Sequence, residues 1–403
     1  MQSDKRYINN PYPDFDDPRS LQYLKENCAP PDAYGYMSLR PDSHLSFKIQ
    51  EASRRLLNTL HQVYFINKGP NRKKDGSVYT GLTGILYVYQ EIGIPWTEID
   101  LYECIQSSNL SHFLGYICGI SGPLAFGACF SNHKDRHLQS LIQLKLSPLF
   151  SDSPEEFLYG KAGYLYALLL VKKHNPDSRK IDETIKEVIA IIIHNGIQSS
   201  KSSKPSKLHY VWYNEEYLGA AHGYAGILST LLRAKAYLNP SQLTIIRDKI
   251  NELAQIQMPS GNFPPSMESL DDDRFVHWCH GAPGFADLYL LAYEVFQVSK
   301  YLQIADRCLD VIWQRGLLKK GFGLCHGSSG NGYAFLLAYK STKDPKHLYR
   351  ALRFADWCSQ LENSHCKTPD NPYSLFEGQA GNASFLHHIQ ANIQNAYFPC
   401  YTL

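Results

Sequence analysis

Two stretches of the sequence read Cys-His-Gly-x-x-Gly, which places two potential metal ligands directly before a pair of glycines. They begin at Cys279 and Cys325. Zinc prefers thiolate and imidazole ligands, and a catalytic zinc keeps three protein ligands with a fourth position open for water or substrate. Cys279, Cys325 and His326 form such a set. His280 is the alternative to His326, because two adjacent Cys-His pairs cannot all converge on one ion, and the sequence does not choose between them.

The Gly-x-x-Gly frame of these stretches occurs seven times in the chain, each time followed by an apolar run. Successive copies begin 38, 41, 63, 58, 46 and 51 residues apart, and such intervals are typical of a helical-hairpin repeat with loop insertions. Because all seven copies share one hydrophobic pattern, they are stronger evidence for a repeated fold than for a catalytic role of the glycines. The first glycines of the copies are Gly81, Gly119, Gly160, Gly223, Gly281, Gly327 and Gly378.

The segments around the glycine turns predict two kinds of helix. The run after each turn is apolar on nearly all sides, as in residues 164–170, and such a helix has to be buried. Between the turns lie amphipathic helices, of which one opens at Pro240 and another at Pro345, while Asn195-Gly196 and Gly316 close two more. The repeated unit predicts an all-α fold, an α/α toroid with seven inner and seven outer helices.

In a closed ring of this kind the glycine turns all lie at one end, so the residue before each first glycine occupies an equivalent place near the axis. Four or five of these seven side chains can act as an acid, a base or a ligand. Cys279 and Cys325 stand one residue earlier. We therefore predict a central active site at this end of the ring. The seven residues are Thr80, Cys118, Tyr159, His222, His280, His326 and Glu377.

The composition limits the class of protein. A formal net charge of +2 and a hydrophobic content of 44% predict a packed core and no nucleic-acid partner. The N-terminus lacks the apolar core of a signal peptide, and the longest apolar runs are about half the roughly 20 residues that a membrane helix requires. The expected location is the cytoplasm, with peripheral membrane association left open. The ten cysteines are better explained as buried small hydrophobes or ligands than as a disulfide framework.

The chain divides into an arm and one domain. Residues 1–44 contain six prolines and lack helical periodicity, which predicts an arm on the surface. Residues 45–403 are predicted to form a single toroid domain, with loops at 68–77 and at the lysine-containing stretch 201–204. The last four residues match a prenylation box at Cys400, but a polar residue stands where an aliphatic one is usual and no basic patch precedes it.

Several stretches of the chain are together highly specific in sequence and in spacing. They are residues 79–84, 158–166, 217–226, 276–284, 316–330 and 367–381, with the tail at 398–399. On these motifs the chain resembles the eukaryotic lanthionine synthetase C-like (LanC-like) family. The resemblance implies an α/α toroid and a zinc site at Cys279, Cys325 and His326. In the bacterial cyclases of that family, zinc activates a peptide cysteine that adds to dehydroalanine or dehydrobutyrine.

The eukaryotic branch of the family binds glutathione. The resemblance therefore implies that this chain adds glutathione to dehydroamino acids in peptides or damaged proteins, or acts as a glutathione S-transferase. Glutathione carries two carboxylates, for which lysines are suitable anchors. Lys367 stands where close relatives have Arg. The lysine ammonium can contact a carboxylate of glutathione as a single charge, whereas an arginine would bind it with two parallel hydrogen bonds. The implied glutathione contacts are Lys320, Lys367, Thr368, Pro369 and Asp370.

Addition of a thiol to a dehydroamino acid requires a thiolate and then a proton. A thiol with a pKa of about 8.5 is mostly protonated at neutral pH, and binding to zinc makes it a thiolate. The enolate left after addition needs a proton at Cα, and His222 is the predicted general acid. Glu377 is predicted to orient the substrate. Glu155 and Glu156 precede the third unit, and the sequence assigns them no role.

Three other classes of protein compete with this interpretation. A prenyltransferase β subunit is also an α/α toroid with zinc, but Asp306 and Cys308 lie two residues apart in a helix, where side chains do not share a face. An α/α-barrel glycosidase needs paired carboxylates near the turns, where only Glu377 qualifies. The remaining rival is a non-catalytic adaptor or thiol-status sensor that binds zinc and glutathione and holds a partner such as a signalling protein. Turnover of a dehydroalanine peptide with glutathione separates this rival from an enzyme.

Overall fold

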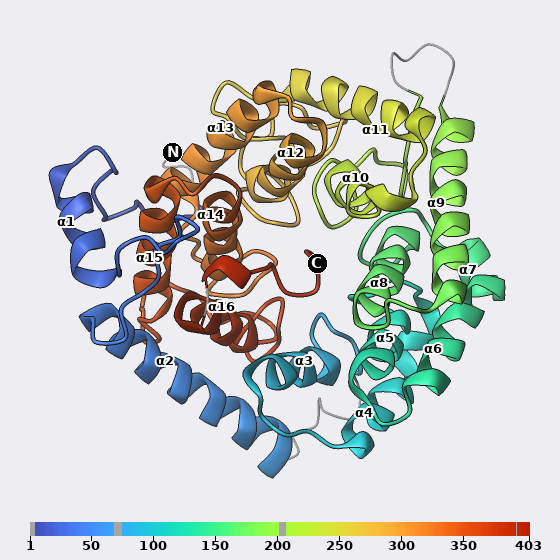
Figure 1. Ribbon diagram of the computed structural model, residues 1–403, viewed down its shortest axis with the longest axis horizontal. Helices are drawn as coiled ribbons and strands as arrows, with labels where there is room; N and C mark the ends of the chain where they lie inside the picture. The colour runs from blue at the N-terminus through green and yellow to red at the C-terminus, as the bar shows by residue number, and fades with distance from the viewer. Residues whose placement is uncertain (1–4, 68–74, 201–206, 392) are drawn as a thin grey trace.

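The computed structural model describes residues 5–67, 75–200, 207–391 and 393–403, and these form a ring of paired helices (Figure 1). Seven inner helices surround the axis and seven outer helices enclose them, which confirms the predicted all-α toroid. The described residues form isolated β-bridges and no strand. The inner helices are α3 (Leu82–Ile92), α5 (Ser121–Phe130), α8 (Lys161–His174), α10 (Tyr224–Arg233), α12 (Ala282–Phe296), α14 (Ser328–Thr342) and α16 (Gln379–Ala391). The outer helices are α2 (His44–His61), α4 (Glu98–Ile105), α6 (Lys134–Gln143), α9 (Arg179–Ser199), α11 (Pro240–Leu253), α13 (Ser299–Arg315) and α15 (Pro345–Cys358).

A circle of backbone hydrogen bonds joins the seven glycine turns and closes the ring. In each turn an amide N–H just before the glycine pair donates to a carbonyl oxygen of the next turn, and the seventh turn donates back to the first over 3.1 Å. The donor and acceptor residues are Tyr79 and Ile117, Cys118 and Leu158, Leu158 and Ala221, Ala221 and Cys279, Cys279 and Cys325, Cys325 and Phe376, and Phe376 and Tyr79. The turns therefore lie together at one end of the toroid.

Glycine is required in these turns because backbone segments approach too closely for a side chain. A Cβ atom added to Gly330 would lie 1.8 Å from the carbonyl oxygen of Leu324. Gly281 also has a φ of +107°, a conformation that residues with a Cβ rarely adopt. The turns are therefore fixed first by packing, and the residues beside the glycines are held in defined positions.

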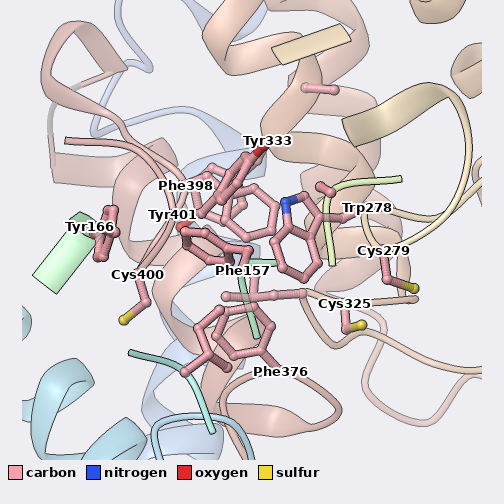
Figure 2. Close-up of a cluster of buried hydrophobic side chains, with 14 of the residues drawn as sticks. Phe157, Tyr166, Trp278, Cys279, Cys325, Tyr333, Phe376, Phe398, Cys400 and Tyr401 are labelled. Carbon is pink, nitrogen blue, oxygen red and sulfur yellow. The ribbon is translucent and has the colours of Figure 1, made fainter. Parts of the chain in front are cut away.

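The C-terminal segment runs into the middle of the ring and fills it with aromatic side chains (Figures 1 and 2). Phe398 stacks on Trp278 with ring centroids 5.5 Å apart, and Tyr401 meets Trp278 edge-on at 5.1 Å. Cys400 is fully buried in the same cluster. A prenyl group on Cys400 would require this plug to leave the core, so the packing argues against the prenylation box.

The N-terminal arm contains a helix that its prolines did not predict. Helix α1 (Pro18–Asn27) follows the N-cap Asp17 and lies outside the ring against α2 and α15 (Figure 1). The expectation of an arm without helical structure was wrong because proline is well tolerated in the first turn of a helix. Before α1 in the arm, the carbonyl oxygen of Arg6 accepts a hydrogen bond from the amide of Lys319 over 3.0 Å. The arm thereby reaches the segment that precedes α14.

The C-terminal end of helix α9 differs from the predicted one. The pair Asn195-Gly196 predicts a helix end, but α9 continues to Ser199. A Cβ atom at Gly196 would lie 2.6 Å from the ring of Tyr210, so glycine here makes room for a tyrosine. Gly316 does follow the end of α13, and α11 and α15 begin at the predicted prolines.

Short elements connect the helix pairs. None of the helices in the described part of the chain is both long and apolar enough to cross a bilayer. The predicted loop at 201–204 lies outside the described residues, as does most of the loop at 68–77. The short elements are α7 (Pro148–Asp152), η1 (Gln62–Ile66), η2 (Ser108–His112), η3 (Leu144–Leu146), η4 (Lys235–Tyr237), η5 (Ala254–Ile256) and η6 (Ile393–Asn395).

Candidate active site

Cys279, Cys325 and His326 come together at the end of the ring that carries the glycine turns. Their ligand atoms all lie within 4.8 Å of one another. The two sulfur atoms point to the same side, away from the aromatic plug (Figure 2). Among the residues that the structure describes, this is the one group of three or more His, Cys, Asp or Glu side chains that gathers in this way. Of the two histidines that the sequence left open, His326 therefore lies beside both sulfurs.

The donor set fits a zinc ion. Two thiolates and one imidazole around a tetrahedral zinc lie roughly 3.5–4 Å apart, which is within the observed limit for this group. Both cysteines are buried and His326 is half-buried. Burial raises the pKa of the Cys325 thiol well above its usual range, so a thiolate at this position needs a neighbouring cation. Three protein ligands are also the number found in catalytic zinc sites.

His222 lies in the turn just before α10 and is paired with a buried carboxylate. Its Nδ1 atom is 2.8 Å from Oε2 of Glu156, which is 1% exposed. The carboxylate also accepts hydrogen bonds from the amides of Leu158 and Tyr159 over 3.0 and 2.5 Å. A carboxylate in its ionised form only accepts hydrogen bonds, so with this partner the imidazole donates through Nδ1 and keeps Nε2 free of the pair.

The sequence left Glu156, the carboxylate that pairs with His222, without a role. Glu156 stands four residues before Gly160, the first glycine of the third unit, whereas His222 precedes the first glycine of the fourth. A carboxylate at that position has no local signature of its own. Its partner becomes visible only when the third and fourth turns are placed side by side by the bonds from Phe157 and Leu158 to the carbonyl of Ala221.

His280 lies near His222 instead of joining the sulfurs. The centroids of the two imidazole rings are 6.3 Å apart. Burial, together with the charges of nearby histidines, lowers the pKa of His280 to about 4. The ring is therefore neutral at pH 7, and it lies beside the rings of Tyr217 and Phe275, with centroids 6.0 and 6.1 Å away.

Glu377 occupies the equivalent place in the seventh turn and is half-buried. Its Oε2 accepts a hydrogen bond from Nδ2 of Asn371 over 2.8 Å, and its amide donates to Oγ of Ser374 over 3.2 Å. Burial opposes protonation of His326, but a hydrogen bond with Cys325, the charge of Cys325 and the charge of Glu377 raise its pKa. Glu377 thus lies close enough to His326 to contribute to this shift.

Lys320 and Lys367 line one cavity of about 660 Å³ beside this cluster. His277 closes the inner end of the cavity, where its ring centroid lies 6.0 Å from that of His326. Burial and nearby positive charges lower the pKa of His277 to about 3. The cavity suits an anion, because seven of its ten lining residues are lysine or arginine and its one carboxylate, Asp273, is paired with Arg315 over 2.7 Å. The basic lining residues are Lys5, Arg6, Arg274, Arg315, Lys319, Lys320 and Lys367.

Lys367 also lines a second cavity of about 290 Å³, together with Thr368, Pro369 and Glu377. The side chains predicted to contact glutathione are thus distributed over two adjoining spaces. Asp370 is exposed and lines neither of them. Arg6 is a further residue that sequence analysis missed, since only the course of the N-terminal arm brings it next to Lys319 and Lys320.

The alternative ligands Asp306 and Cys308 do not form a metal site in the described structure. Cys308 is fully buried in α13 and accepts a hydrogen bond from Nε2 of Gln257 over 3.5 Å. Asp306 instead lies 3.7 Å from Nε2 of His347. The prenyltransferase-like pattern is therefore a coincidence of helix packing.

Fold and site together define an α/α toroid with a Cys₂His cluster at its turn end. Residues 100–403 match the family of lanthionine synthetase C-like proteins. The chain is 37% identical over 418 residues to a Danio rerio protein named "Glutathione S-transferase LANCL1", and the alignment covers 99% of each chain. The chain therefore belongs to the lanthionine synthetase C-like family.

Nisin cyclase has a similar solved structure. Its TM-score is 0.67 at 18% sequence identity, and the superposition covers 87% of this chain and 97% of nisin cyclase. At this identity the likeness concerns the fold, and it supports the assignment of the ring as a LanC-like toroid.

Proposed function

We propose that this protein is a zinc-dependent transferase that adds the thiol of glutathione to dehydroalanine or dehydrobutyrine residues of peptides and proteins, or to other electrophiles. The observation that carries the proposal is the cation-lined cavity that meets the Cys279, Cys325 and His326 cluster at His277. Family membership and the name of the Danio rerio relative support the same conclusion. A small thiol with several carboxylates fits this combination of charge and metal ligands.

Glutathione would enter through the basic cavity. Its two carboxylates would pair with Lys320 and Lys367, which are both exposed and able to follow the ligand. Charge-assisted hydrogen bonds of this kind are stronger than neutral ones. Because the cavity ends at His277 beside the metal ligands, a tripeptide anchored by its ends can direct its central thiol toward Cys279, Cys325 and His326.

Zinc held by Cys279, Cys325 and His326 would supply the acidity that converts the glutathione thiol into a thiolate near neutral pH. In the addition itself, the sulfur forms a bond with Cβ of the dehydroamino acid, and the electrons of the Cα–Cβ double bond move into the enolate. His222, after taking up a proton from solvent on Nε2, gives that proton to Cα, while Glu156 stabilises the proton that stays on Nδ1. The thiol proton, released to solvent, balances the proton that His222 takes up.

The test combines metal analysis with turnover. Purified protein should contain one zinc per chain and should convert a dehydroalanine peptide into a product heavier by one glutathione. An adaptor or thiol sensor using the same pocket would bind zinc and glutathione without forming product. Absence of product at saturating glutathione, with zinc present, would therefore reject the enzymatic proposal in favour of the non-catalytic one.

A further inference from the structure

A cluster of aromatic side chains continues outward from His222 to the surface of the ring. Trp212 stacks on the imidazole of His222 with ring centroids 4.3 Å apart, and Tyr213 meets Trp212 at 4.5 Å. On the other side Tyr159 lies 5.8 Å from His222 and 4.5 Å from Phe113. We call Phe113, Tyr159, Trp212, Tyr213 and Tyr217 the aromatic wall.

The outer part of this wall is exposed. Tyr213 is 79% exposed and Phe113 is 40% exposed, and the neighbouring Val211 is 48% exposed. Large side chains of this kind lose unfavourable contact with water when a partner covers them, and contiguous exposed apolar groups often mark binding sites. The wall differs from a scattered surface residue because its rings are in contact with one another and with a predicted catalytic side chain.

The wall is also held rigidly. Trp212 and Glu215 exchange backbone hydrogen bonds of 3.0 Å, and the two residues between them, Tyr213 and Asn214, have φ values of +48° and +63°. A tyrosine with positive φ is strained, and such strain persists where surrounding structure fixes it. The base of the turn is fixed by Glu216, whose amide donates to Glu268 over 3.1 Å. The fold therefore presents the Tyr213 ring in a preformed position.

The charge around the wall is opposite to that of the basic cavity. Partial burial, the charge and hydrogen bond of Glu215 and the charge of Glu268 raise the pKa of Tyr217. Two carboxylates thus border the wall, whereas lysines and arginines line the proposed glutathione cavity. An anionic tripeptide is favoured on one side of the metal ligands, and a neutral or basic ligand is favoured at the wall.

We propose that the aromatic wall binds the acceptor peptide, and that an aromatic or large aliphatic side chain next to the electrophilic residue packs against Tyr213 and Phe113. This inference rests on the proposed function, because it names the second substrate of the same site. His222 has to reach Cα of the acceptor, so the acceptor backbone passes this imidazole and its neighbouring side chains meet the wall. A basic residue beyond the apolar one is complementary to Glu215 and Glu268.

A binding experiment tests the wall without turnover. Two fluorescein-labelled peptides carry alanine in place of the electrophile and differ only in the adjacent residue, phenylalanine or glycine. Fluorescence anisotropy should show tighter binding of the phenylalanine peptide, and Tyr213→Ala or Phe113→Ala should weaken it about three- to tenfold. Tyr213→Phe should retain it. Tyr102→Ala is the matched control, since Tyr102 lies on α4 and is 63% exposed.

Turnover then separates failure of this inference from failure of the proposed function. Tyr213→Ala should lower kcat/KM for a phenylalanine-flanked dehydroalanine peptide more than for N-acetyldehydroalanine methyl ester, which lacks a flanking residue. Equal binding of the two labelled peptides by the wild-type protein, or an equal loss in Tyr102→Ala, would overturn the wall as a binding site. Failure of the wild-type protein to convert either electrophile would overturn the proposed reaction, while the anisotropy result would still decide the wall.

Discussion

Nδ1 of His222 and Oε2 of Glu156 are 2.8 Å apart, although 66 residues separate them in the chain. The pair joins the third and fourth turns of the ring, and the proposed mechanism uses it for proton transfer and not for binding glutathione. It therefore offers the sharpest distinction between an enzyme and a binding protein.

Replacing Glu156 by glutamine should lower kcat by about 10- to 1000-fold, because the neutral amide no longer stabilises the charged imidazole or fixes its tautomer. Zinc content and glutathione affinity should stay at wild-type values, since Glu156 touches neither predicted site. Glu156→Asp should restore part of the rate. A parallel loss of zinc, glutathione binding and thermal stability would instead assign Glu156 a purely structural role.

The His222→Asn variant should keep zinc and glutathione and should form product about 10²- to 10⁴-fold more slowly, because it lacks the proposed donor of the Cα proton. Single-turnover measurements with a dehydroalanine peptide isolate this step from product release. Full turnover in this variant would transfer protonation to water or to another residue. Combining it with Glu156→Gln should add little further loss, since the two residues act as one unit.

Lys320→Ala and Lys367→Ala should each weaken glutathione binding by about 1.5–3 kcal/mol, the typical contribution of a hydrogen bond to a charged group. Zinc should remain stoichiometric in both variants. Lys367→Arg should bind glutathione more tightly than the wild type, because arginine grips a carboxylate with two hydrogen bonds. Calorimetric titration measures all three, and unchanged affinity in both alanine variants would remove these lysines from the site.

The ring itself could be predicted because its signal is local and repeated. The glycine pair and the apolar run that follows it occur seven times. One wrong helix end, such as the end predicted for α9 at Asn195-Gly196, therefore does not alter the predicted architecture. The prolines of the arm gave a weaker signal, since Pro18 opens a helix and does not exclude one. Short-range patterns thus determined the fold without determining every helix end.

The site was less predictable because it depends on small backbone differences and distant contacts. The two Cys-His turns look alike in sequence, yet Gly281 has a φ of +107° and Gly327 a φ of −124°. The glycine that follows His280 thus has a different backbone conformation from the glycine that follows His326. This difference accompanies the different positions of the two histidine side chains. Arg6 reaches the basic cavity through the packing of the arm, which no local pattern encodes.

The buried His347 should make the protein less stable in acid. Its side chain is 2% exposed, and burial lowers its pKa to about 4. An unfolded histidine has a pKa of about 6.5, so the unfolded chain binds the proton first as the pH falls. The stability contributed by the neutral ring is therefore present above about pH 6.5 and is lost progressively toward pH 4, by on the order of 1–3 kcal/mol.

Urea unfolding at pH 7 and pH 4.5 measures this effect. His347→Gln cannot titrate, so its free energy of unfolding should fall less between the two pH values than that of the wild type. His365→Gln is the control, because His365 is exposed. If His347→Gln and the wild type lose the same stability, the acid sensitivity belongs to other groups.

The last prediction concerns the metal ligands and the ring. Cys325→Ala should lower zinc content and thiol addition together, because removing one of three ligands weakens the site that makes the thiolate. The toroid should remain folded, since its turns are joined by backbone hydrogen bonds and its centre is filled by Trp278, Phe398 and Tyr401. Metal analysis, circular dichroism and the turnover assay are made on the same preparation, with Cys129→Ala as the control, because Cys129 is a buried cysteine on α5 whose sulfur faces the carbonyl of Leu170. Full zinc in Cys325→Ala, or equal zinc loss in Cys129→Ala, would show that the Cys-His turns serve packing alone.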